Sequence, residues 1–136
     1  MVSGGFLPLA EHIKSVLGLD YCFANTLEVD AGGNFTGQVV GDIVDAKRKA
    51  QVLNMLAEKH GIDRSQILAV GDGANDLLML ADAGVGVAFR AKPIVQERAP
   101  FRVNDSSLAT VLYMLGFNDE DIRRLLEIPD DASLVI

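Results

Sequence analysis

The sequence predicts an α/β fold in which a parallel sheet is covered by flanking helices and carries a small β-hairpin. Two continuous apolar runs, at residues 67–70 and 85–89, are typical of parallel strands that are buried on both faces. Segments with the helical apolar period of about 3.6 residues alternate with these runs. This alternation favours a parallel sheet wrapped by helices.

The first third of the chain contains several short elements. Apolar residues 1–2 indicate the end of a buried strand, and Ser3-Gly4-Gly5 indicates a turn. A helix with apolar residues from Leu9 to Leu17 should stop at Gly18. The next segments are predicted as a short buried strand at residues 21–24 and a hairpin with strands at residues 26–30 and 35–40.

The rest of the chain continues the alternation of strands and helices. A helix at residues 47–60 should end at Gly61, since glycine commonly terminates helices. The later elements are predicted as strands 67–70, 85–89 and 101–103 and helices 77–83, 93–98, 107–115 and 119–126. We expect residues 1–104 to form the core and residues 105–136 a helical tail that packs on it or extends from it.

Composition excludes several classes of function. The chain has 136 residues, enough for one domain, and a net charge of −7 without a cluster of Lys and Arg, so no nucleic-acid partner is expected. No stretch reaches the roughly 18 apolar residues that span a bilayer, so no membrane contact is expected. The only cysteine, Cys22, cannot form an internal disulfide, which favours a reducing, cytoplasmic location.

The strongest chemical motif is Gly71-Asp72-Gly73-Ala74-Asn75-Asp76, between an apolar strand and a helix. Ligands of open α/β sheets bind beyond the carboxyl ends of the strands, where this loop lies. Asp72 could there bind a hard divalent cation, and Asp76 could support that site. Capping of the following helix is the alternative. Capping explains Asn75 or Asp76, but it does not explain two glycines that flank an aspartate.

Two weaker features suggest that an anion binds nearby. Ser3-Gly4-Gly5 offers a hydroxyl and backbone N–H groups where a strand meets a helix, although many such tripeptides are plain turns. Lys49 lies in the first turns of its helix, where the helix dipole disfavours a cation. A surface lysine is the alternative for Lys49 and for its neighbour Lys47.

In their order along the chain, these motifs resemble the second, third and fourth motifs of the haloacid dehalogenase superfamily. Together with Gly41-Asp42 and Ala91-Lys92-Pro93, they resemble the phosphoserine phosphatase family within it, over about residues 2–103. The resemblance implies a haloacid dehalogenase-like (Rossmannoid) core, Mg²⁺ as cofactor and O-phosphoserine as substrate. It also implies hydrolysis to serine and phosphate through an aspartyl-phosphate.

The resemblance also implies roles for individual residues. Ser3, the N–H of Gly4, and Asn75 would bind the phosphoryl group. Lys49 would neutralise the charge of that group, and Asp72 would ligate Mg²⁺. Asp76 would act with Lys49 in catalysis by supporting the metal site.

One part of the family pattern is absent from this sequence. The family's first motif, an Asp-x-Asp pair that carries the nucleophile at the end of the central strand, has no counterpart here, nor has the cap domain. The only Asp-x-Asp, Asp119-Glu120-Asp121, opens a predicted helix, where acidic capping explains it. Asp42 and Asp45 follow no buried strand. We therefore expect an incomplete sheet that lacks its central nucleophile strand, in a chain that is inactive alone.

The absent strand has consequences for partners and for function. A sheet without its central strand leaves two ladders unpaired, so the chain should pair with the missing amino-terminal segment or form a swapped homodimer. Two other functions remain open on the sequence. One is a non-catalytic module that binds phosphate and metal, and the other is a related phosphatase for another small phosphate ester.

Overall fold

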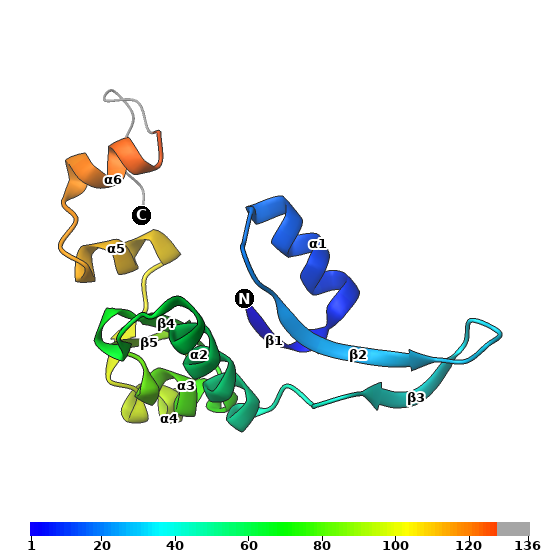
Figure 1. The fold of residues 1–136 in the computed structure, drawn as a ribbon. Helices are drawn as coiled ribbons and strands as arrows, with labels where there is room; N and C mark the ends of the chain where they lie inside the picture. The colour runs from blue at the N-terminus through cyan, green and yellow to red at the C-terminus, as the bar shows by residue number, and fades with distance from the viewer. Residues whose placement is uncertain (128–136) are drawn as a thin grey trace.

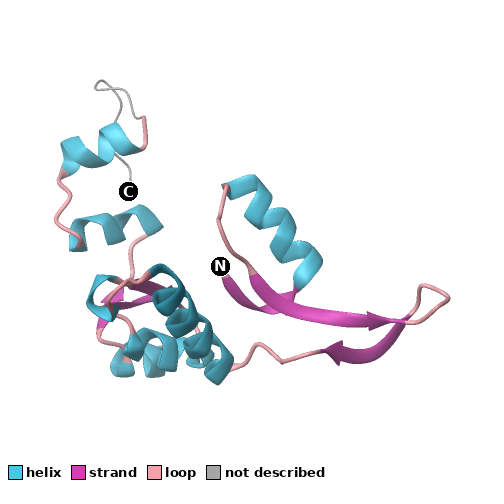
Figure 2. Cartoon of the chain, in the orientation of Figure 1, coloured by secondary structure: helices cyan, strands magenta, loops and turns pink. Residues whose placement is uncertain are grey.

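The computed structural model describes residues 1–127, whose six strands form two separate three-stranded sheets (Figures 1 and 2). The first sheet has the order β1-β2-β3 and the second the order β4-β5-β6. The strands are β1 Val2–Phe6, β2 Phe23–Val29, β3 Phe35–Val40, β4 Leu68–Gly71, β5 Val85–Phe89 and β6 Phe101–Val103. The predicted α/β fold with parallel strands and a hairpin is confirmed.

Within residues 1–127, six α-helices connect and cover these strands. They are α1 Leu7–Leu17, α2 Ala46–His60, α3 Leu77–Asp82, α4 Pro93–Arg98, α5 Val111–Met114 and α6 Asp119–Leu125. Gly18 and Gly61 follow α1 and α2 in the left-handed region, with φ of 62° at each, so the predicted ends of these helices are confirmed. Residues 128–136 of the predicted tail lie outside the described part of the chain.

The first sheet corrects two predictions. Ser3-Gly4-Gly5 is not a turn but the middle of β1, which pairs in parallel with β2 through an irregular register. The strand predicted at residues 21–24 and the first hairpin strand are one continuous strand, β2. Asn25 is the third residue of β2, and its side chain donates a hydrogen bond to the carbonyl of Gly4, which links the two strands.

The second sheet is regular and parallel, and helices cover both of its faces. Strand β4 pairs with β5 in a continuous register from Leu68 to Gly71, and β5 pairs with β6 without a register shift. On one face, α2 and α3 bury Leu53 and Leu80 against Ala69 of β4. On the other face, Val111 of α5 packs against Val87 of the central strand β5 and Val103 of the outer strand β6. Both faces of β4 are therefore packed just before the Gly-Asp-Gly motif at its carboxyl end.

A cleft of about 720 Å³ lies between the two sheets. Within the described residues, β1 pairs only with β2 and β4 only with β5, so each has one edge without a neighbouring strand. Val2 of β1 and Val70 of β4 both line the cleft, and Val52 and Leu56 of α2 contribute apolar side chains to it. The two half-sheets therefore border a shared apolar space.

No helix within residues 1–127 combines the length and the apolar character that crossing a membrane requires.

Candidate active site

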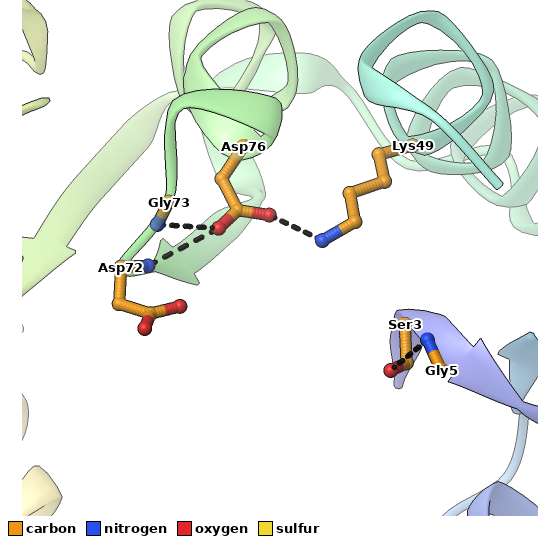
Figure 3. A network of polar contacts seen from close by, with 6 residues as sticks. All are labelled: Ser3, Gly5, Lys49, Asp72, Gly73 and Asp76. Carbon is orange, nitrogen blue, oxygen red and sulfur yellow. Dashed lines mark hydrogen bonds and ion pairs between the residues drawn. The ribbon is translucent and has the colours of Figure 1, made fainter.

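The loop after β4 is organised by one buried carboxylate, that of Asp76 (Figure 3). Asp76 is 4% exposed. Its Oδ2 accepts hydrogen bonds from the backbone N–H groups of Asp72 at 3.1 Å and of Gly73 at 3.0 Å. The loop is thus folded around this side chain, and the position of Asp72 depends on it.

The two glycines of the motif are needed for space rather than for backbone conformation. A Cβ on Gly71 would lie 2.5 Å from the Cβ of Asp76, and one on Gly73 would lie 2.4 Å from Oδ1 of Asn75. Neither glycine has a positive φ. The backbone therefore approaches the Asp76 side chain more closely than any other residue type would allow.

The second oxygen of Asp76 binds Lys49, which comes from α2. Lys49 Nζ lies 2.6 Å from Oδ1 of Asp76, and the Lys49 residue is only 6% exposed. Lys47, two residues earlier, is exposed to solvent. Asp45 caps α2 by accepting from the N–H of Arg48, which fixes the turn that carries Lys49. A cation is thereby held beside the motif despite the unfavourable end of the helix dipole.

Asp72 and Asn75 are the uncommitted polar side chains of the loop. Both residues are exposed, and within residues 1–127 neither side chain has a hydrogen-bond partner. Figure 3 shows the Asp72 carboxylate pointing away from Asp76. These groups are available to a ligand, whereas both oxygens of Asp76 are already used.

The donor set fits a magnesium ion that is only partly coordinated by this chain. In the part of the chain that the structure describes, no three Asp, Glu, His or Cys side chains gather closely enough to hold a metal. Mg²⁺ is commonly held by one or two carboxylates together with waters and substrate phosphate oxygens. The free carboxylate of Asp72 suits such a site as one of its ligands.

In Figure 3, Ser3 of β1 lies on the same side of the view as Lys49 and apart from Asp72. Its hydroxyl oxygen accepts a hydrogen bond from the N–H of Gly5 at 3.0 Å. Gly4 is exposed, and its carbonyl is bound by Asn25. Ser3, Lys49 and Asp72, which are distant in sequence, come from β1, α2 and the loop after β4, and Figure 3 draws them in one view.

The other acidic residues considered from the sequence have local structural roles. Asp119 opens α6, whose first turn is closed by a reciprocal capping box between Asn118 and Asp121. Asp42 pairs with Arg48 at 3.8 Å, and Asp45 is the cap of α2. Within residues 1–127, the structure therefore provides no Asp-x-Asp pair at the end of a strand.

Asn25 is a polar residue of this region that sequence reasoning missed. It is only 8% exposed and bonds to Gly4 on β1 and to Val44 just before α2. An asparagine directly after the apolar residues 21–24 was the available signal, because a buried amide requires hydrogen-bond partners.

The fold is that of haloacid dehalogenase-like hydrolases. Residues 1–81 match the model of that family, and the chain belongs to it. Among curated proteins, the chain is 48% identical over 128 residues to a probable phosphoserine phosphatase of Schizosaccharomyces pombe, covering 93% of this chain and 43% of the relative. It is also 48% identical over 133 residues to the phosphoserine phosphatase of Streptomyces coelicolor, covering 98% and 32%.

Solved structures give the same result. A probable phosphoserine phosphatase from Vibrio cholerae superposes with a TM-score of 0.79 at 40% identity, covering 94% of this chain and 38% of that one. A structure described as a phospho-aspartyl intermediate analogue of phosphoserine phosphatase gives a TM-score of 0.76 at 42% identity, covering 83% and 54%. The chain spans less than half the length of the two curated relatives above.

Proposed function

We propose that this chain is the carboxyl-terminal part of a magnesium-dependent phosphoserine phosphatase. The whole enzyme would hydrolyse O-phosphoserine to serine and phosphate. The observation that carries the proposal is the buried Lys49–Asp76 pair beside the free carboxylate of Asp72, at the carboxyl end of a parallel strand. The similarity to phosphoserine phosphatases over nearly the whole chain supports the choice of substrate.

The residues of this chain would position and neutralise the phosphoryl group. Lys49, oriented by Asp76, would supply a cation that water cannot screen well, because its side chain is buried. Ser3 and the N–H of Gly4 would donate hydrogen bonds to phosphoryl oxygens from β1, with Asn75 donating from the loop after β4. Asp72 would be a ligand of Mg²⁺, which when bound supplies positive charge to the phosphoryl oxygens.

The nucleophile would come from a segment outside this chain. An aspartate of that segment would attack phosphorus and form an aspartyl-phosphate while serine leaves with a proton. Water would then hydrolyse this intermediate and release phosphate. The apolar cleft between β1 and β4 supports this division, since Asp76 lines it and a strand placed there would lie beside both unpaired edges. A second copy of the chain that exchanges strands is the alternative occupant.

The direct test is phosphate release from O-phosphoserine with Mg²⁺, by this chain alone and after the amino-terminal segment of the Schizosaccharomyces pombe relative is added. We expect no turnover by the chain alone and turnover once the segment is present. Turnover by the chain alone would show that its own residues supply a nucleophile, with Asp42, Asp45 and Asp119 to be replaced next. Saturable phosphate binding without turnover in either case would instead indicate a non-catalytic binding module.

The metal assignment has a separate test in the chain alone. Asp72→Asn removes the carboxylate charge but keeps the shape of the side chain, which is exposed, so the fold should be unchanged. We expect Mg²⁺ binding, followed by calorimetry, to be abolished. Unchanged Mg²⁺ affinity would refute the assignment. Asp42→Asn, at another exposed aspartate, is the matched control and should bind Mg²⁺ as the parent chain does.

A further inference from the structure

Asn25 is a buried polar residue whose side chain bridges two parts of the proposed phosphate site. Its Nδ2 donates a hydrogen bond to the carbonyl oxygen of Gly4 at 2.8 Å. Its Oδ1 accepts a hydrogen bond from the N–H of Val44, also at 2.8 Å. Both ends of the amide are therefore used, and the residue is 8% exposed.

The two backbone groups that Asn25 joins lie beside the residues proposed to bind phosphate. Gly4 follows Ser3 in β1, and Val44 immediately precedes Asp45, the cap of the helix that carries Lys49. The backbones are close at this point, since a Cβ on Gly4 would lie 3.6 Å from the carbonyl oxygen of Val44. Asn25 thus connects the Ser3 segment of the first sheet to the beginning of α2.

This connection matters because α2 packs mainly on the second sheet. Leu53 of α2 belongs to the core formed with β4 and α3, whereas Ser3 belongs to the first sheet. At the other end of α2, far from Lys49, Nε2 of His60 forms a hydrogen bond with the hydroxyl of Tyr21 at 3.0 Å. The first sheet is thus one unit, and α2 with the second sheet is the other. Near the site, the Asn25 side chain links these two units through its hydrogen bonds.

We propose that Asn25 is a positioning residue of the phosphate site, which sets the placement of the Ser3–Gly4 segment relative to Lys49. The inference rests on the proposed function. Asn25 would touch neither phosphate nor metal, and it would act through Gly4 and Val44. A phosphoryl group needs donors from both units at once, so a shift between the units weakens its binding even when each unit remains folded.

Asn25→Asp separates this role from a general contribution to stability. The aspartate can still accept from the N–H of Val44, but it cannot donate to Gly4, so two acceptors face each other. We expect the affinity for inorganic phosphate, measured by calorimetry with Mg²⁺ on the full chain, to fall by about tenfold. The affinity for Mg²⁺ alone should not change, because Asp76 rather than Asn25 holds the loop of Asp72.

Asn54→Asp is the matched control. Asn54 also lies on α2, and its Nδ2 donates to Oδ2 of Asp82 at 2.9 Å, so the same substitution again brings two acceptors together. The control should lower the melting temperature without weakening phosphate binding. Equal losses of phosphate affinity in both variants would overturn the inference, as would unchanged phosphate affinity in Asn25→Asp.

A second measurement separates failure of the inference from failure of the proposed function. If the parent chain does not bind phosphate at all, the proposed function fails for this chain, and amide chemical shifts in Asn25→Asp then decide the inference. Concerted shifts at Gly4, Gly5 and Lys49 would support the connection between the units. Shifts confined to β1 would overturn it.

Discussion

At the scale of single residues, Asp76 is the side chain on which the site depends. One carboxylate oxygen holds the loop that presents Asp72, and the other holds Lys49. Both members of the ion pair are buried, so each relies on the other for compensation of its lost hydration. Replacing Asp76 should therefore disturb both the position of Lys49 and the loop that presents Asp72.

Lys49→Met and Asp76→Asn should each lower the free energy of unfolding by about 3–5 kcal/mol, because each removes one partner of a buried pair. The double variant should lose less than the sum of the two, since no unpaired charge remains buried. Urea unfolding of the four chains gives the coupling energy. Lys47→Met, at an exposed lysine of the same helix, is the control and should change stability little. Additive losses would contradict the pairing.

At the scale of elements, the hairpin of β2 and β3 is stabilised by its turn. Oδ1 of Asp30 accepts from the N–H groups of Gly32 at 2.8 Å and Asn34 at 2.9 Å. Gly33 between them has a φ of 84°, a conformation that favours glycine. Hydrogen bonds from Asn34, first from its backbone, lower the pKa of Asp30 below its ordinary value of 3.8.

The hairpin turn should consequently loosen in acid. A carboxyl whose pKa is lower in the folded state adds stability that is present above its unfolded pKa and is lost as the pH falls through the folded pKa. We expect the amide resonances of Gly32 and Asn34 to move toward random-coil values only below about pH 3.8. Asp30→Asn should remove this pH dependence. A midpoint above the ordinary carboxyl pKa would contradict the assigned hydrogen bonds.

At the scale of the whole molecule, the main feature is the division of the strands between two half-sheets. Within residues 1–127, β1 and β4 each have one edge without a neighbouring strand, and residues of both strands line the same cleft. Open edges next to apolar side chains invite pairing with another chain. The chain therefore presents an incomplete sheet that an added strand would close.

An apolar dye such as ANS should bind this cleft in the isolated chain. Adding the amino-terminal segment should reduce the dye fluorescence and raise the melting temperature, because the segment would bury the cleft and bind only the folded state. A scrambled segment of equal length is the control. Dye fluorescence that does not change on addition of the true segment would refute occupancy of the cleft.

Much of the local structure could be predicted because it depends on neighbouring residues. Gly18 and Gly61 end helices through their own backbone conformation, and the hairpin follows from its glycine-containing turn. The Gly-Asp-Gly motif marked the carboxyl end of β4 because strand, glycines and acidic residues are contiguous there. The turn predicted at Ser3-Gly4-Gly5 was wrong, because pairing with β2, a distant segment, keeps these residues extended.

The sequence by itself determined the α/β class, the alternation of strands and helices after the hairpin, and the motif that carries Asp72. These depend on periodicity and on contiguous residues, which are visible along one chain. Only the tertiary structure decided that Lys49 rather than Lys47 is buried, that it pairs with Asp76, and that Asn25 links the two units. These hydrogen bonds and the ion pair join residues about 20 or more positions apart in the chain. Such contacts depend on how sheets and helices pack, and not on local conformational preference.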